Sequence, residues 1–308
     1  MVNLNRFDLI SLRLFVAVVD AGSLTAGADR FGISLAAASK RICEFEQHCG
    51  VALLQRGQRG VVVTAEGQSL HRHAVEVIAR LEQLAQSVDD LQSGACGHLR
   101  LWANPSALSG FLPDVLARYA QRHPRVRMNL EDALSEDGVR AIEKGVAELA
   151  VIGDNVPFGE LETLVCNVDR LVLLVPQDHR FAQQPCVAIR HAVEEDLVTL
   201  ARSASLTRKV IAAAEAVGRT VRIRVQVRSF DTMCRMVACR LGLAVMPQAA
   251  AGLYAQALGL CIVGLDGVQV ERRLLLAMRK RSELSLAAAA LVDMIEAEVG
   301  AAPVAAST

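Results

Sequence analysis

Short hydroxyl and basic side chains gather in one N-terminal stretch, residues 23–42, which reads SLTAGADRFGISLAAASKRI. Hydroxyl groups such as those of Ser34 and Ser39 can exchange hydrogen bonds with the edges of bases. The positive charges of Lys40 and Arg41 can neutralise phosphates. These residue types, at the start of one helix, are typical of a helix that enters the major groove of DNA.

The spacing of the apolar residues in this stretch predicts two short helices joined by a tight turn. Gly32 suits the left-handed end of the first helix, and Ser34 suits the N-cap of the second. Such a pair places its second helix against DNA, although an ordinary helical hairpin in a protein core would show the same spacing. The apolar residues recur at intervals of four and three: Leu24, Ala28 and Phe31, then Ala38, Ile42 and Phe45.

A basic turn beside a short alternating run predicts a wing after the helix pair. Arg56, Arg59 and Gly60 precede the run Val-Val-Val-Thr at residues 61–64, and basic side chains at such a turn can contact phosphates. With a preceding helix marked by Leu12, Phe15, Val16 and Val19, residues 1–64 are predicted to form a winged helix-turn-helix domain. The predicted DNA-binding residues are Ser23, Ser34, Leu35, Ala36, Ser39, Lys40, Arg41, Arg56 and Arg59.

Residues 65–94 are predicted to form one long helix, with Thr64 as its N-cap. Its apolar residues keep a heptad spacing between polar neighbours, which favours a two-helix dimer seam over a helix lying against its own domain. His71 and His73 are two residues apart and point to different faces, so we expect solvated side chains and no metal site. The predicted seam is Leu70, Ala74, Val77, Leu81, Leu84, Val88 and Leu91.

From about residue 95 the pattern changes to alternating strands and helices, which predicts an α/β domain with parallel strands. The pattern contains two similar halves, and the last strand and helix are able to return to the first half. The predicted strands are residues 98–103, 125–130, 149–153, 161–166, 171–176, 197–200, 221–227, 243–246, 260–263 and 273–278. The predicted helices are residues 109–122, 135–144, 205–217, 231–239, 249–257 and 284–299.

The N-terminal motifs together resemble those of the LysR-type transcriptional regulators. The matching positions are Leu14-Phe15, Gly22-Ser23, Ser34 to Ser39, Glu46, Gly50, Leu53, Arg56, Arg59-Gly60-Val61, Thr64 and Gly67. One departure affects base reading: Leu35 and Ala36 stand where many members have Gln followed by Pro or Ser. A Gln amide can bind adenine through two hydrogen bonds, whereas Leu35 can only contact a thymine methyl group.

This resemblance implies a C-terminal effector-binding domain with the two-lobed fold of type 2 periplasmic binding proteins. Residues 95–300 would form it, with lobe I at about 95–166 and 267–300 and lobe II at about 167–266. A tail at 301–308 is predicted to be disordered. The resemblance also implies a bacterial homodimer or homotetramer that binds double-stranded operator DNA, with RNA polymerase as a further partner.

Polar residues follow four of the predicted strands, where parallel sheets bind ligands. In the family fold these loops meet at the cleft between the lobes, although each hydroxyl or carboxylate can also serve as a plain helix cap. Arg202 offers a fixed positive charge, so the predicted effector is a small molecule such as an organic anion. The predicted effector-binding residues are Asn104, Ser106, Asp132, Ser135, Arg202, Ser203, Ser205, Phe230 and Asp231.

Composition excludes several other classes of protein. Apolar residues make up 52% of the 308 residues, yet no uninterrupted run is long enough for a membrane span. Phosphate-binding, nucleophile-elbow and zinc-protease motifs are absent, so we expect neither an enzyme nor a cofactor. The formal net charge is zero. A cytoplasmic protein is predicted.

Eight cysteines leave a second mode of regulation open. None forms a C-x-x-C pair, which favours reduced thiols in a cytosolic protein. A redox-operated regulator is the alternative, with Cys234 and Cys239 five residues apart. A metabolite-binding α/β protein without DNA binding is the third reading.

Overall fold

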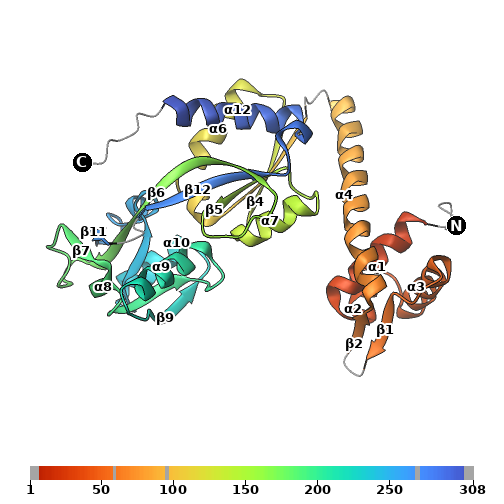
Figure 1. Ribbon diagram of the computed structural model, residues 1–308, viewed down its shortest axis with the longest axis horizontal. Helices are drawn as coiled ribbons and strands as arrows, with labels where there is room; N and C mark the ends of the chain where they lie inside the picture. Colours follow the sequence, from red (N-terminus) through yellow and green to blue (C-terminus); the bar gives the residue numbers. More distant parts are fainter. Residues whose placement is uncertain (1–6, 58–59, 94–96, 268–270, 302–308) are drawn as a thin grey trace. The chain divides into compact units, whose positions relative to one another are not determined.

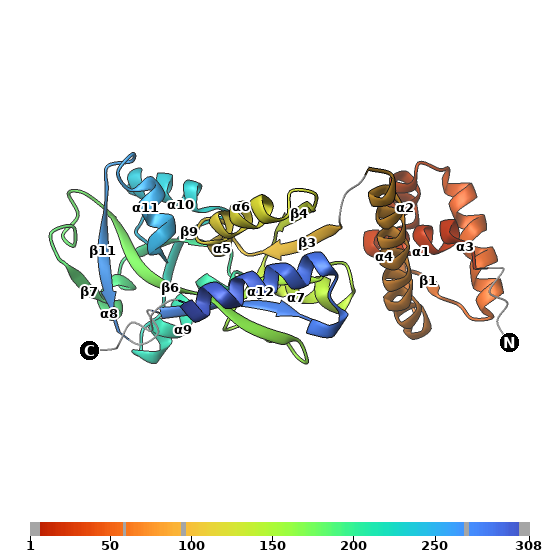
Figure 2. The same cartoon turned by 90° about the horizontal axis from the view of Figure 1, so that it is seen from above.

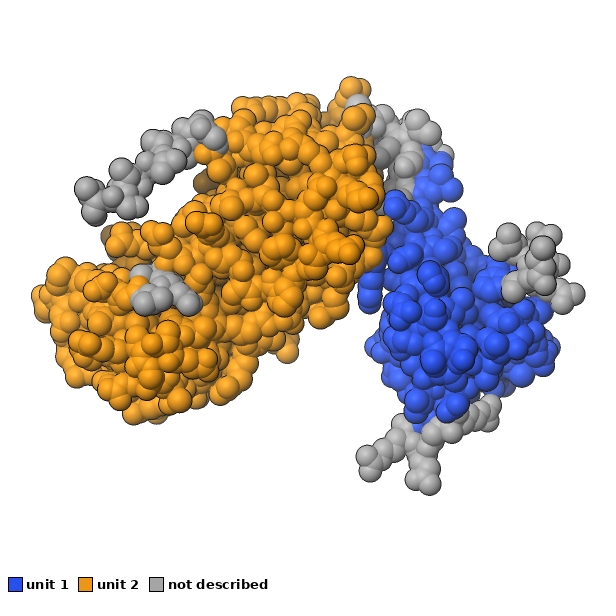
Figure 3. All heavy atoms as spheres, viewed as in Figure 1, with its two compact units in different colours: residues 1–91, 144–146 blue, residues 92–143, 147–308 orange. Residues whose placement is uncertain are grey.

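The computed structural model describes residues 7–57, 60–93, 97–267 and 271–301, and the chain divides into two compact units (Figure 3). Unit 1 comprises residues 1–91 with 144–146, and unit 2 comprises residues 92–143 with 147–308. Arg59, Cys96 and the predicted tail from residue 302 lie outside the described residues, as do the side chains of Arg56 and Leu91. In the described part of the chain, unit 1 packs around one hydrophobic core and unit 2 around two.

The described residues of unit 1 form a winged helix-turn-helix followed by a long helix (Figure 1). Strands β1 and β2 pair antiparallel, which confirms the predicted wing hairpin. The elements are α1 (Leu9–Ala21), α2 (Leu24–Phe31), α3 (Leu35–Cys49), β1 (Leu54–Gly57), β2 (Gly60–Val63) and α4 (Ala65–Ser93).

Local sequence signals set the ends of the two central helices. The Ser34 hydroxyl accepts a hydrogen bond from the Ala37 amide at 3.3 Å and so caps α3. Gly32 ends α2 with φ 68°, a left-handed conformation that costs a residue with a side chain more than it costs glycine. The turn between the helices is therefore determined by adjacent residues.

The apolar faces of these helices meet in one small core. Phe15 and Phe45 lie with ring centroids 5.9 Å apart. The Glu46 carboxylate accepts hydrogen bonds from the Leu53 and Leu54 amides at 2.8 and 2.9 Å, which ties α3 to the start of the wing. The buried core residues are Leu12, Leu14, Phe15, Val18, Ala28, Ala38, Ile42, Phe45, Leu53 and Ala74.

Helix α4 begins at Ala65, as predicted, because the Thr64 hydroxyl accepts a hydrogen bond from the Gly67 amide at 2.9 Å. The expectation that His71 is solvated was wrong. His71 is buried, and its Nε2 lies 3.0 Å from a carboxylate oxygen of Asp20 at the end of α1. The first turns of α4 pack on the winged domain, and that packing covers His71.

The predicted dimer seam divides into two parts, because the first turns of α4 pack on the winged domain. Ala74 is buried and Leu70 is partly buried in the core of unit 1, so these two positions belong to the domain's own packing. Further along α4 the seam residues have large exposed fractions, which is unusual for apolar side chains at heptad spacing. These fractions are 49% for Val77, 40% for Leu81, 60% for Leu84 and 47% for Val88.

Unit 2 is built on a mixed sheet in the order β4-β3-β5-β12-β6-β11-β7, with β10 also paired to β6. Strand β3 pairs parallel with β4 and β5, which confirms the parallel strands predicted at the start of this domain. One group of elements packs around a core that we call lobe I. It comprises β3 (His98–Ala103), α5 (Pro105–Leu108), α6 (Leu112–Arg122), β4 (Arg127–Asp132), α7 (Ser135–Glu143), β5 (Leu149–Gly153), β12 (Glu271–Met278), a short 3-10 helix (Arg281–Glu283) and α12 (Leu286–Ala301).

The remaining elements pack around a second core, which we call lobe II. Its strands β8 and β9 form a separate parallel pair. The elements are β7 (Cys186–Ala188), α8 (Ile189–Ala192), β8 (Asp196–Leu200), α9 (Ser205–Ala216), β9 (Arg222–Val227), α10 (Phe230–Ala238), β10 (Ala244–Pro247), α11 (Gln248–Tyr254) and β11 (Leu260–Asp266).

Strand β6 (Glu162–Pro176) belongs to both lobes. Its residues 162–170 pair with β12, and its residues 171–176 pair with β10 and β11. Figures 1 and 2 show β6 in green and β12 in blue, lying side by side where the chain passes between the lobes. The predicted separate strands at 161–166 and 171–176 were wrong, because this single strand continues through the polar residues between them.

Two further expectations about unit 2 need correction. The helix predicted at residues 109–122 begins only at Leu112, as α6, where Pro113 favours the first helical turn. A separate short helix that was not predicted, α5, precedes it and is capped by Asn104. Strand β7 and helix α8 were not predicted, since both are very short. Among the described residues, no helix is both long and apolar enough to cross a membrane.

We expect the exposed part of the seam to pair α4 with a second copy of the chain. Leu84→Glu should therefore shift the sedimentation coefficient toward that of the monomer, because the pairing would bury two carboxylates in an apolar seam. Arg72→Glu, at an exposed position of the same helix outside the seam, serves as the matched control. An unchanged oligomer in the Leu84 variant would contradict the assignment of the seam.

Candidate functional site

The N-terminal end of α3 presents a small, mixed surface. Leu35 and Ala36 are exposed on its first turn, next to the capping residue Ser34. Lys40 follows one turn later with its side chain 79% exposed, and its ammonium group lies 3.9 Å from Glu44 on the same helix. This surface offers methyl groups, a hydroxyl and one positive charge to a ligand.

Two other predicted DNA-binding residues, Ser23 and Arg41, serve the domain itself in addition to any contact they make with DNA. Ser23 caps α2 through a 3.4 Å hydrogen bond from the Ala26 amide. The guanidinium of Arg41 lies 3.3 Å from both the Asp8 carboxylate and the Ser11 hydroxyl, which joins α3 to the start of α1. Ser39 is half-buried. The side chains of Arg56 and Arg59 in the wing lie outside the described residues.

In unit 2, four of the predicted effector-binding residues come together between the lobes. The Ser135 hydroxyl accepts hydrogen bonds from the Gly153 amide at 3.1 Å and the Asn104 amide group at 3.4 Å. It lies 3.3 Å from the hydroxyl of Ser205, which belongs to the other lobe. Ser106 is also buried and joins the group because its hydroxyl accepts a hydrogen bond from Arg272, which is described below.

The other five predicted effector-binding residues do not join this group. Asp132, Arg202, Ser203 and Asp231 are exposed, and Phe230 is buried in the core of lobe II. Partial burial of its carboxyl group nevertheless raises the pKa of Asp132. Arg202 is therefore not the buried positive charge of this region.

That charge belongs to Arg272, which the sequence analysis missed. Its side chain is only 1% exposed. One terminal nitrogen donates to the Ser106 hydroxyl of lobe I at 2.7 Å, and the other donates to the Ser205 hydroxyl of lobe II. Arg272 lies inside strand β12 and not in a loop after a strand, which is where ligand-binding residues of parallel sheets are expected.

A buried carboxylate, Asp169 on β6, lies opposite Arg272 in the antiparallel ladder. The nearest oxygen and nitrogen of the two groups are 3.9 Å apart. Asn167 donates a hydrogen bond to the other carboxylate oxygen at 2.9 Å. The segments Val-Asp-Arg (168–170) and Glu-Arg-Arg (271–273) carry opposite charges, but they are far apart in the sequence, so only their pairing in the sheet indicates this contact.

Burial controls the ionisation of this pair. It raises the pKa of Asp169 to about 6, even though Arg272 and the hydrogen bond from Asn167 both favour the charged carboxylate. Burial also lowers the pKa of Arg272, against the attraction of Asp169 and Asp154. The desolvation of both charges is therefore only partly offset by their mutual attraction.

Further contacts hold the two lobes together beside Arg272. The Lys209 ammonium of α9 lies 3.3 Å from the Asp154 carboxylate, which follows β5. The Asn155 amide group donates to the backbone oxygen of Ser205 at 2.8 Å. An ion pair between Arg208 of α9 and Glu136 of α7 adds a third contact. The cleft is therefore closed in this structure.

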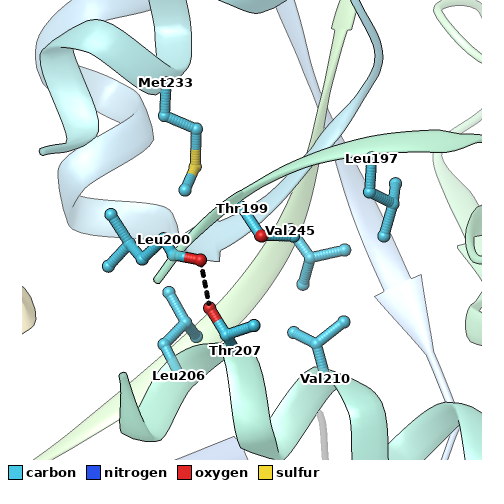
Figure 4. A pocket seen from close by; sticks show the side chains of 8 residues that line it. All are labelled: Leu197, Thr199, Leu200, Leu206, Thr207, Val210, Met233 and Val245. Carbon is cyan, nitrogen blue, oxygen red and sulfur yellow. Dashed lines mark hydrogen bonds between the residues drawn. The ribbon is translucent and has the colours of Figure 1, made fainter. Parts of the chain in front are cut away.

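Two small cavities lie at or near the closed cleft in the described part of the chain. A cavity of about 10 Å³ lies between Asn104, Ser106, Ser135, Ser205 and Arg272. A second cavity of about 10 Å³ lies inside lobe II between apolar side chains and Thr199 (Figure 4). Each volume is close to the space that one buried water needs. A larger ligand at the cleft would require the lobes to move apart.

A larger cavity of about 280 Å³ lies in lobe II beside the first residues of β8 and β9. The arginines that line it already pair with carboxylates, Arg222 with Asp196 at 2.9 Å and Arg240 with Asp178 at 2.6 Å. These side chains are more than half exposed, apart from Asp196, so the cavity is lined by solvated surface ion pairs.

The described cysteines are free thiols and do not form a reactive pair. Cys234 is fully buried, whereas Cys239 is exposed. Burial raises the pKa of Cys234 to about 11 and also raises that of Cys166, which opposes formation of the thiolate that reacts with oxidants. Among the described residues, no group of His, Cys, Asp and Glu could hold a metal ion.

A winged helix-turn-helix joined to a two-lobed α/β domain with a charged cleft defines the class of transcriptional regulators that respond to small molecules. Comparison with known families agrees. Residues 9–68 match the family model described as bacterial regulatory helix-turn-helix protein, lysR family, and residues 92–300 match that of the LysR substrate binding domain. The chain belongs to the LysR family of DNA-binding transcriptional regulators.

Relatives in the curated proteins match over nearly the whole chain. An uncharacterised HTH-type transcriptional regulator, YfeR of Shigella flexneri, is 28% identical over 290 residues, covering 94% of this chain and 93% of the relative. A RuBisCO operon transcriptional regulator of Allochromatium vinosum is 24% identical, covering 94% of this chain and 96% of its own.

Solved structures share the fold. Full-length CbnR in complex with its target DNA has a TM-score of 0.71 at 18% identity, with 94% of this chain and 99% of that chain covered. Full-length OxyR from Pseudomonas aeruginosa has a TM-score of 0.63 at 16% identity, with 96% of each chain covered.

We expect Arg272→Met alone to destabilise lobe I by about 3–5 kcal/mol at pH 8, because the buried Asp169 carboxylate loses its cation and must either stay ionised without a counter-charge or take up a proton. Arg272→Met combined with Asp169→Asn should cost much less. Urea unfolding followed by the fluorescence of Trp102, the single tryptophan, measures both, since Trp102 lies in β3. Arg190→Met replaces an exposed arginine of α8 as the control. Equal losses in the single and double variants would contradict the pairing.

Proposed function

We propose that the N-terminal end of α3 reads operator DNA in the major groove, with Ser34, Leu35, Ala36 and Lys40 as the contacting residues. The exposed surface on the first turns of α3 supports this proposal, because a recognition helix contacts bases with its N-terminal residues. Arg41 and Ser23 position the helices. The wing residues Arg56 and Arg59 add phosphate contacts.

In this proposal, the preference for particular operator sequences depends on the shape of the DNA and on contacts with thymine methyl groups. Leu35 cannot form the paired hydrogen bonds with which an amide side chain reads adenine, but it can contact a thymine methyl group. Ser34 and Ser39 supply short polar contacts. The protein therefore recognises its operator partly through the width and deformability of the DNA.

We also propose that Val77, Leu81, Leu84 and Val88 pair α4 with the same helix of a second copy. A dimer would present two recognition helices to a partly palindromic operator, which requires two-fold symmetry. The regulator would act in the cytoplasm and would have no catalytic activity of its own.

The proposed effector is a small organic anion that binds at Arg272, Ser106, Ser135 and Ser205 when the lobes separate. The single observation that carries this proposal is the buried guanidinium, whose hydrogen bonds go to one hydroxyl from each lobe. An anion in the cleft would compensate this charge and change the separation of the lobes. Such differential binding to two lobe arrangements is what a ligand needs in order to regulate.

Redox control receives less support than control by a ligand. The alternative needs a reactive thiolate beside a resolving cysteine. Cys234 on α10 is buried, whereas Cys239, which follows this helix, is exposed. A metabolite-binding protein without DNA binding does not agree with the helix-turn-helix family match.

Lys40→Ala should reduce the slope of log affinity against log salt by about 0.9 for a mixed-sequence DNA duplex, the expected loss for one phosphate contact. Fluorescence anisotropy at several salt concentrations measures this slope. Lys280→Ala removes an exposed lysine of unit 2 as the matched control and should leave the slope unchanged. Equal slopes in the Lys40 variant and the wild type would remove Lys40 from the interface.

Small organic acids should raise the melting temperature of the wild-type protein, with a stabilisation of about 2.7 kcal/mol at one hundred times the dissociation constant. A thermal-shift panel of mono- and dicarboxylates tests this expectation. Arg272→Gln should abolish the ligand-induced shift, whereas Arg202→Gln, at the exposed arginine, should retain it. A panel in which Arg202→Gln alone loses the shift would place the anion site at the exposed loop instead.

A further inference from the structure

We propose that Asp169 is an internal counter-ion that must take up a proton before an anion can bind to Arg272. Binding of the effector is then coupled to the uptake of one proton by unit 2. This inference rests on the proposed effector site and adds to it the residue that sets its pH dependence.

The geometry of the pair leaves atoms available on both partners. Asp169 and Arg272 are 5% and 1% exposed and lie opposite each other on β6 and β12. Their closest approach, 3.9 Å, is too long for a hydrogen bond. The Nε atom of Arg272 and the Oδ2 atom of Asp169 are buried and have no hydrogen-bond partner in the described part of the chain. The two charges attract each other, but the two groups form no hydrogen bond with each other.

A bound anion would face the carboxylate of Asp169 across one guanidinium. Two carboxylates that share a single buried cation cannot both remain ionised at low cost, so one of them is protonated. Small organic acids in water have pKa values of about 3–5, close to those of free side-chain carboxyl groups. Burial has already raised the pKa of Asp169 to about 6. Asp169 is therefore the group that accepts the proton.

In the described part of the chain, Arg272 is the charged group that pairs with Asp169, and the nearby Cys166 thiol is neutral because burial and Asp169 both raise its pKa. Asp154, after β5, is paired with Lys209 of α9 at 3.3 Å, so their charges offset each other. Asn167 on the same strand is neutral. The adjacent charged residues of the two strands, Arg170, Glu271 and Arg273, are exposed to solvent.

The exchange balances in charge and in protons. A proton from solvent neutralises Asp169, most simply at Oδ2, which otherwise has no partner. The anion then replaces Asp169 as the counter-charge of Arg272, and the net charge of the cluster stays the same. The protonated carboxyl group also gains an O–H donor directed at the cluster, so one side of the anion accepts from arginine and another from Asp169.

Formate is the probe for a test on the full chain, because it stays ionised from pH 5.5 to 8 and is small enough for a confined site. Its neutral analogue formamide serves as the ligand control. In the wild type, the affinity for formate should fall by about tenfold per pH unit above pH 6 and level off below it. Calorimetry in two buffers of different ionisation enthalpy should show about one proton taken up per formate at pH 7.5.

Two variants test whether Asp169 is the group that takes up the proton when formate binds. Asp169→Asn should bind formate with an affinity that no longer depends on pH. Asp132→Asn, which removes the other carboxylate of this region with a raised pKa, should keep the wild-type dependence. The calorimetric measurement on the wild type needs no substitution, so it decides the question even if Asp169→Asn does not fold.

The outcomes separate this inference from the proposed function. Formate binding that is equally strong at all pH values, without proton uptake, would overturn the inference and leave the anion site at Arg272 intact. A wild-type pH dependence in Asp169→Asn would also overturn it, since the proton would then be taken up elsewhere. If formate and formamide both fail to bind at every pH, the proposed anion site fails and the inference fails with it.

Discussion

Arg272 carries a positive charge at a position where almost none of its surface reaches solvent, and the groups that compensate this charge come from both lobes. Ser106 belongs to lobe I and Ser205 to lobe II, while Asp169 lies on the strand that passes between them. A buried charge is costly unless it is paired and hydrogen-bonded. The closed arrangement of the lobes therefore depends on keeping this one guanidinium satisfied, and any molecule that satisfies it better can change that arrangement.

The DNA-binding unit depends on a different principle, which is the control of helix ends by neighbouring residues. Serine caps and glycine turns fix where α2 and α3 begin and end, so the angle between them is set locally. Tertiary contacts then attach the other elements to this pair. Glu46 holds the start of the wing, Arg41 joins α3 to α1, and His71 joins α4 to α1. Small side chains at the start of α3 are thereby presented on a rigid support.

Much of the fold could be predicted from the sequence because its signals are local. Heptad spacing, N-cap serines and alternating apolar runs located the wing, the long helix and most strands of unit 2. The predictions were wrong where a contact with a residue distant in the sequence changed the environment of a side chain. His71 was expected in solvent but is covered by the winged domain, and β6 continues through polar residues because β12 pairs with it there. The candidate effector site was half-predicted: four serine and asparagine residues meet at the cleft, whereas Arg202 and Asp231 remain in solvent.

The sequence by itself determined the family, the helix-turn-helix and the order of most strands and helices, because these follow from the spacing of residues that are close along the chain. Only the tertiary structure decided which charge lies in the cleft. Arg272 and Asp169 are far apart in the sequence and look like ordinary strand residues, with charged neighbours that are exposed. Their burial results from the return of the last strand to the first lobe, which places them opposite each other. Desolvation, which gives both groups their chemistry, is a property of that packing and cannot be read from residue types or their spacing.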